Sequence, residues 1–229
     1  MLSTLNSRRR RSRKNGDWAD RSVYPIIEQD ENSVSLTFKV YLPTTPASSV
    51  LVTYDVTGDG RVWIKEEYEP VEGLPPMPEF GMLFKWNADF NNVTYYGNGP
   101  LENYVDRNKG AKLGIYSDKV ENMMESYIRP QETGNRTGVR WAKITDNRGR
   151  GILFEAPDTM NFSALPYTPD ELEAAAHPYE LPRYNKTVVR CSLMQMGIAG
   201  DDSWGAKTHP EFLLPNDQKL TFVMCFKGI

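Results

Sequence analysis

This chain consists mainly of short segments in which apolar and polar residues alternate. Turn residues separate these segments. The clearest example alternates apolar with polar side chains at Val34, Leu36, Phe38 and Val40. Because successive side chains of a β-strand point to opposite faces, this pattern predicts a strand buried on one side. Similar segments recur along the 229 residues, which predicts about a dozen strands in one large antiparallel β-sandwich or barrel.

Turn residues between such segments predict three hairpins. Residues 50–56 and 61–67 flank Thr57-Gly58-Asp59-Gly60, and residues 139–145 and 151–154 flank Asp146-Asn147-Arg148-Gly149. A third hairpin is expected to join residues 211–214 to residues 220–227. The proline-rich residues 73–78 cannot form a central strand, so we expect them to cross an edge or connect sheets.

One short helix is predicted near residues 169–176. Thr168 supplies an N-cap hydroxyl, Pro169 suits the first helical position, and Glu171 places a carboxylate three residues after the cap. We expect this helix to end before Pro178.

The N-terminal end carries six positive charges, at arginines 8–11, Arg13 and Lys14, although the net charge of the chain is −3. We expect residues 1–17 to be a basic disordered tail and residues 18–229 to form one domain. The remainder is acidic and offers no basic face with interleaved aromatic residues, which argues against nucleic-acid binding.

No apolar run approaches the roughly 18 residues of a membrane-spanning helix, and none follows the basic run as in a signal peptide. We therefore expect no membrane association and lean towards a cytoplasmic protein, with secretion left open. Cys191 and Cys225 lie in alternating apolar segments and are expected to be buried free thiols. Two cysteines and two histidines do not suggest a zinc site, so no metal site is expected.

A glycine-rich, acidic loop at residues 196–205 carries a large indole, Trp204. Sugars stack their C–H faces on aromatic rings and bond to carboxylates, so Trp204 beside Asp201 and Asp202 suggests a carbohydrate contact. The alternative is an indole that folds back and caps the core.

Two further polar segments, residues 95–107 and 129–136, combine turn residues with aromatic and charged side chains. They could bind a sugar or an ion, but such clusters more often brace long loops, with an arginine paired to a carboxylate and tyrosines closing over it. We assign this structural role to Glu102, Asn103, Tyr104, Asp106, Arg107, Glu132 and Arg136.

No residue is assigned a catalytic role. Glycosidases commonly use two carboxylates, but the sequence does not give the separation of Glu102, Asp106, Glu132, Asp201 and Asp202. His177 and His209 accompany no nucleophile in a recognisable motif.

Four separated motifs resemble one family in order and spacing. They are residues 97–107 (GNGPLENYVDR), residues 127–136 (YIRPQETGNR) with Val139-Arg140-Trp141, residues 161–164 (NFSA) before Leu172, and residues 196–204 (MGIAGDDSW). The family is the C-terminal domain, or small chain, of the β-galactosidases of glycoside hydrolase family 2, and the likeness spans residues 18–229.

The resemblance implies an antiparallel β-supersandwich of the galactose-mutarotase type. The family's upstream segment of Thr-Asp-Asn-Asp type has no match here, so the first strands of that fold are expected to be missing. An exposed edge or apolar patch would result. We expect the preceding polypeptide, or a homodimer, to cover it.

The resemblance also implies a division of labour. In the family, two catalytic glutamates and the magnesium ligands lie on a preceding TIM-barrel domain, which this chain lacks. We therefore expect no cofactor here, no hydrolysis by the chain alone, and a partnership with the β-galactosidase large chain or upstream domains. Trp204 would form a platform at the mouth of the galactoside pocket of a retaining glycosidase. Gly200, Asp201 and Asp202 would shape its loop.

Two other functions stay open. The domain could bind galactosides or a glycan surface without catalysis. An aldose epimerase would need a histidine acid and a glutamate base in one cleft, and His177 and His209 fit no such pattern.

Overall fold

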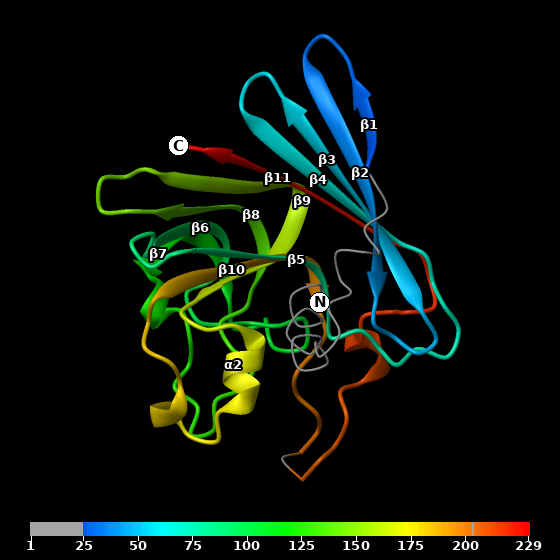
Figure 1. Ribbon diagram of the computed structural model, residues 1–229. Coiled ribbons are helices and arrows are strands. Elements are labelled where there is room, and N and C mark those ends of the chain that lie inside the picture. The colour runs from blue at the N-terminus through cyan, green and yellow to red at the C-terminus, as the bar shows by residue number, and fades with distance from the viewer. Residues whose placement is uncertain (1–24, 203) are drawn as a thin grey trace.

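The computed structural model describes residues 25–202 and 204–229 (Figure 1). This part contains eleven strands, one α-helix and three 3-10 helices. The strands are β1 (Ile26–Gln29), β2 (Ser33–Leu42), β3 (Ser48–Thr57), β4 (Arg61–Tyr68), β5 (Glu79–Asn87), β6 (Asn92–Gly99), β7 (Lys112–Lys119), β8 (Arg136–Thr145), β9 (Gly151–Leu165), β10 (Lys186–Gln195) and β11 (Leu220–Gly228). The helices are η2 (Val120–Asn122), α2 (Pro169–Ala174), η3 (Pro178–Glu180) and η4 (Pro210–Phe212).

All of these strands pair antiparallel in one branched sheet. The main path runs β1-β2-β3-β4-β11-β9-β8-β6-β7, and β10 pairs with both β9 and β5. The branch arises at β9, whose first half pairs with β11 and whose last residues pair with β10. The expected all-β antiparallel class, with one short α-helix, is confirmed for the described residues.

The branch folds over the main path and encloses the core. Phe84 of β5 lies with its ring centroid 5.5 Å from that of Phe154 and 5.8 Å from that of Phe226, on β9 and β11. Strands β1 to β4 form two long hairpins that project from the rest of the sheet (Figure 1). The core therefore fills only part of the sheet's length.

Two of the three predicted hairpins are confirmed. Strands β3 and β4 pair in register across residues 57–60, and β8 pairs with β9 across residues 146–149. Gly60 and Gly149 both have φ of +81°, a left-handed conformation that glycine adopts without steric cost.

The third predicted hairpin is wrong. Residues 210–212 form η4, Leu214 makes an isolated bridge to Met77, and β11 pairs with β4 and β9. Pro210 lacks an amide hydrogen and suits the start of a helical turn, which disfavours a strand here. The predicted connection at residues 73–78 is confirmed, because it links β4 to β5 and, among the described residues, makes no strand pairing other than the isolated bridge from Met77 to Leu214.

The predicted helix is present as α2, with both halves of its capping box. The Thr168 hydroxyl accepts from the Glu171 amide at 3.3 Å, and the Glu171 carboxylate accepts from the Thr168 amide at 2.8 Å. It ends at Ala174, slightly earlier than expected, because Ala175 is already extended.

Cys191 and Cys225 are free and buried, as predicted. No helix in the described part of the chain is long and apolar enough to cross a membrane. The predicted basic tail, residues 1–17, lies outside the described residues.

Candidate functional site

Three polar loops meet at one end of the sheet. They are residues 100–111 between β6 and β7, residues 123–135 before β8, and residues 196–219 between β10 and β11. Hydrogen bonds that Glu102 accepts join the first loop to the second, and a hydrogen bond that Asp106 accepts joins the first loop to the third.

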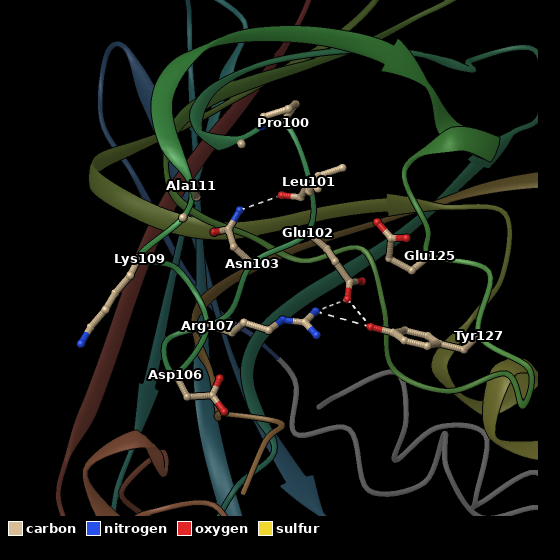
Figure 2. A pocket seen from close by; sticks show the side chains of 12 residues that line it. Pro100, Leu101, Glu102, Asn103, Asp106, Arg107, Lys109, Ala111, Glu125 and Tyr127 are labelled. Atoms are coloured by element: carbon tan, nitrogen blue, oxygen red, sulfur yellow. Dashed lines mark hydrogen bonds and ion pairs between the residues drawn. The ribbon is translucent and has the colours of Figure 1, made fainter. Parts of the chain in front are cut away.

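Glu102 is the centre of the first junction. One of its carboxylate oxygens accepts from the Thr133 hydroxyl and from the Gly134 amide, each at 2.7 Å, and the other accepts from Arg107 and Tyr127 (Figure 2). Burial alone would raise the pKa of Glu102, but these hydrogen bonds outweigh it and lower that pKa. Glu102 is therefore a fully engaged carboxylate that holds two loops together.

Asn103 continues this junction through its amide and its backbone. Its side-chain oxygen accepts from the Thr137 amide at 2.9 Å and from the Thr137 hydroxyl, and its side-chain nitrogen donates to the carbonyls of Asn98 and Leu101. The Asn135 side chain donates to the Asn103 carbonyl at 2.8 Å. The side-chain oxygen and the backbone of Asn103 thus tie this loop to Asn135 and Thr137 at the start of β8, and its side-chain nitrogen ties the loop to the end of β6.

Tyr104 leads from these loops into a buried ionic cluster. Its hydroxyl donates to Glu132 at 3.3 Å, and Arg190 donates to both oxygens of Glu132, at 2.8 and 3.1 Å. Arg190 also lies 3.2 Å from Glu79 and donates to Gln195. Burial would lower the pKa of Arg190, but the charges of Glu132 and Glu79 outweigh it and raise that pKa.

Arg136 braces the same region from β8. It is buried, and it donates to the Tyr95 hydroxyl at 3.1 Å and to the Asn135 carbonyl at 3.2 Å. Its guanidinium carbon lies 5.9 Å from the centroid of the Tyr95 ring, a distance at which cation and ring attract each other.

A surface pocket of about 740 Å³ opens beside the first junction (Figure 2). Its lining includes the polar side chains of Glu102, Asp106, Arg107 and Tyr127 and the apolar side chain of Leu101. No histidine is among the described residues that line the pocket.

Asp106 connects this pocket to the loop that carries Trp204. One oxygen of Asp106 accepts from the Ala199 amide at 2.8 Å. A Cβ atom at Gly197 would lie 2.7 Å from the Asp106 carboxylate carbon, so only glycine lets the two loops approach this closely.

The Trp204 loop is tied down at its base and projects at its tip. The Met196 amide donates to the Pro78 carbonyl at 3.0 Å, and the Gly197 amide donates to the Phe212 carbonyl at 2.8 Å. Nearer the tip, Gly200 passes so close to Ala206 that a Cβ atom would lie 2.2 Å from the Ala206 carbonyl oxygen. The two sides of the loop therefore pass very close to each other near its tip.

Trp204 itself is 92% exposed. The alternative that its indole caps the core is wrong in this structure. Asp202 supports the tip by accepting from the amides of Trp204 at 2.8 Å and Ala206 at 3.2 Å. Asp201 lies 2.8 Å from the His209 imidazole, and this hydrogen bond raises the pKa of His209.

The site holds several carboxylates, but the structure engages most of them with named partners. No group of three or more histidine, cysteine or acidic residues is placed to hold a metal ion among the described residues.

Arg190, at the centre of the ionic cluster, is a site residue that the sequence did not predict. A lone arginine within the apolar residues 188–194 was the available signal, because charges are rarely buried unless paired.

Comparison with known proteins places the chain in a family. A family model described as the beta galactosidase small chain matches residues 4–226. The chain belongs to the β-galactosidase small-chain family. This small-chain domain is 47% identical over 182 residues to a β-galactosidase of Priestia megaterium, covering 80% of the chain and 18% of that protein. It is 42% identical over 209 residues to a β-galactosidase of Halalkalibacterium halodurans, covering 90% of the chain and 21% of that protein.

The small-chain domain thus spans about a fifth of the length of the curated relatives it matches. These proteins carry it as one part of a much larger β-galactosidase. A galactose mutarotase related enzyme of Lactobacillus acidophilus superposes with a TM-score of 0.42 and 12% identity, over 90% of this chain and 71% of that one.

Proposed function

We propose that this domain completes the galactoside pocket of a retaining β-galactosidase by presenting Trp204 to the substrate. The observation that carries the proposal is an indole that is 92% exposed at the tip of a loop fixed at its base. A solvated aromatic ring on a loop that is anchored at its base offers a stacking face for a sugar. Gly200, Asp201 and Asp202 shape that loop.

The proposal assigns the chemistry to the rest of the polypeptide. Retaining hydrolysis uses one carboxyl group as acid and base and a second as nucleophile. Here Glu102 accepts hydrogen bonds from Thr133, Gly134, Arg107 and Tyr127, and Glu132 is paired with Arg190. The catalytic glutamates and the magnesium ion therefore belong, in this proposal, to the large chain or to upstream domains.

The test reconstitutes the enzyme from its parts. The pure chain should not hydrolyse a chromogenic galactoside, and activity should appear when it is mixed with the Priestia megaterium enzyme from which the matching segment has been removed. Hydrolysis by the pure chain that a single carboxylate substitution abolishes would refute the proposal.

A matched pair of variants then tests Trp204. In the reconstituted enzyme, Trp204→Ala should raise KM about tenfold, which corresponds to the roughly 1.4 kcal/mol expected of one aromatic contact. Tyr179→Ala is the control, because Tyr179 is 80% exposed on η3, outside the three loops. An equal effect of both substitutions would contradict a specific role for Trp204.

Calorimetry separates this proposal from a stand-alone binding module. A binding module should release heat with millimolar galactose or lactose in the absence of any partner. A domain that only completes the pocket should release no heat, because it contributes only part of the galactoside-binding site.

A further inference from the structure

The Trp204 loop has two limbs, which project side by side from the sheet (Figure 1). Residues 196–202 lead away from β10, and residues 204–214 return towards β11. The limbs are joined at the base, where the Gly197 amide donates to the Phe212 carbonyl at 2.8 Å and the Thr208 hydroxyl donates to the Gly197 carbonyl at 3.1 Å. These bonds involve no ionisable group, so the pH does not affect them directly.

The tip of the loop is tied to this base through Asp201 and His209. Asp201 lies on the outgoing limb, three residues before Trp204, and its carboxylate is 2.8 Å from Nε2 of His209 on the returning limb. Asp202, by contrast, bonds within the tip, to the amides of Trp204 and Ala206. The Trp204 indole is 92% exposed and so has little packing of its own. Its position relative to the base therefore depends on contacts such as that between Asp201 and His209.

The backbone of His209 belongs to the anchored base. Pro210 follows it and begins η4, and His209 has the extended conformation, with φ of −60° and ψ of 145°, that suits a residue before proline. The His209 carbonyl also accepts from the Phe212 amide at 3.0 Å. The imidazole therefore reaches from a fixed backbone to the tip of the loop.

Two carboxylates face this imidazole: Asp201 lies against Nε2, and Glu211, on η4, lies 3.7 Å from Nδ1. The Asp106 carboxylate, which packs against the base from the first loop, accepts from the Ala199 amide. A neutral imidazole has one N–H donor, whereas the imidazolium has two and carries a positive charge. The hydrogen bond to Asp201, together with the charges of Asp201 and Glu211, raises the pKa of His209. The contact is therefore strongest below the ordinary histidine pKa and weakens as the pH rises through the raised value.

We propose that His209 is a positioning residue for Trp204, and that its imidazolium form clamps the tip of the loop through Asp201 and so holds the indole in place for substrate. The inference rests on the proposed function for the role of Trp204, but the clamp is a property of the isolated domain. Raising the pH removes the charge from His209 and loosens the tip. The affinity of the assembled enzyme for a galactoside therefore falls at alkaline pH through this residue.

NMR spectroscopy of the isolated chain tests the clamp without any partner. The imidazole signals of His209 and the ring C–H signals of Trp204 are followed against pH, and in the wild type they should titrate with one midpoint. Asp201→Asn should lower that midpoint, because it removes the charge that stabilises the imidazolium. His209→Gln should abolish the titration of the Trp204 signals.

His177→Gln is the matched control. His177 is the other histidine of the chain and lies 3.2 Å from Glu180, outside the three loops. This variant should leave the titration of the Trp204 signals unchanged. Trp204 signals that do not follow His209, or that titrate equally in His209→Gln, would overturn the inference.

The reconstituted enzyme tests the consequence for substrate binding. The ratio of KM in His209→Gln to KM in the wild type is measured at several pH values, so that titrations elsewhere in the enzyme cancel. The ratio should be about threefold at pH 6, which is the effect expected of an exposed ion pair. It should approach one at pH 9, with kcat unchanged throughout, and His177→Gln should give a ratio of one at every pH.

A ratio for His209→Gln that is the same at pH 6 and pH 9 would show that His209 acts without its charge and would overturn the inference. Failure of the proposed function has a different signature. If Trp204→Ala left KM unchanged, the role of Trp204 in the galactoside pocket would be refuted, while a shared titration of His209 and Trp204 in the isolated chain would leave the clamp standing.

Discussion

Glu66 provides the sharpest test of the packing. It lies on the inward face of β4, in register with Val52 and Phe222, and its exposed fraction is 0%. Neither carboxylate oxygen has a hydrogen-bond partner among the described residues. Burial, together with the negative charge of Glu79, raises the pKa of Glu66 from 4.5 to about 7.

This shift makes folding stability depend on pH in a defined direction. The folded-state pKa of Glu66 lies above the unfolded value, so the stabilisation by the protonated form is complete below pH 4.5 and is lost as the pH rises through 7. A shift of about 2.5 units corresponds to about 3 kcal/mol. Glu66→Gln removes this titration, so its advantage over wild type in the free energy of unfolding should grow by about that amount between pH 4.5 and pH 8.

Urea unfolding at several pH values measures the difference. Glu67→Gln is the control, because the Glu67 side chain is 24% exposed, lies on the opposite face of β4 and pairs with Lys65 at 2.9 Å. The raised pKa of His209 also makes stability depend on pH, but His209 is common to all three proteins, so its contribution cancels in the comparison. If Glu66→Gln showed the same pH dependence as wild type, the argument from an unpartnered buried carboxylate would be refuted.

Three further substitutions probe the loop end. Trp204→Ala should change the free energy of unfolding in urea by less than about 0.5 kcal/mol, because the indole is almost fully solvated; a large loss would indicate hidden packing. Glu102→Gln should lower the free energy of unfolding by about 3 kcal/mol at neutral pH, because it removes charge-assisted hydrogen bonds such as the one that the Gly134 amide donates. The lowered pKa means that this stabilisation is present above the usual carboxyl pKa and lost as pH falls through the lowered value; thermal melts at pH 7 and pH 3 would show the difference shrink. Gly200→Ala should lower the activity of the reconstituted enzyme severalfold while leaving unfolding nearly unchanged, because its Cβ would collide with the Ala206 carbonyl and displace the loop.

Local patterns were enough to predict much of this fold. Alternation identified β2, and the glycine-containing turns at residues 57–60 and 146–149 identified two hairpins, because a hairpin depends on neighbours in the sequence. The capping box located the start of α2 for the same reason. Prediction failed at residues 211–214, where the true partner of β11 is β4, far away along the chain.

The loop end was predictable only in part. Turn glycines and clustered charges marked residues 97–107 and 127–136 as polar loops, and the pairing of Arg107 with a carboxylate was among the expectations. The sequence did not show that Arg190 would join Glu132 to Glu79, because that cluster gathers residues separated by 58 and 111 positions.

The sequence by itself determined the strand-rich class, the helix start, two turns and the membership in the β-galactosidase small-chain family, since each depends on local chemistry or on motif order. Tertiary structure alone decided that Trp204 is solvated rather than packed, and that Glu66 is buried with no hydrogen-bond partner in residues 25–202 and 204–229. The exposure and the hydrogen-bond partners of these side chains depend on which distant strands pair. Strand pairing depends on the apolar surface that the whole sheet buries, and no single segment contains that information.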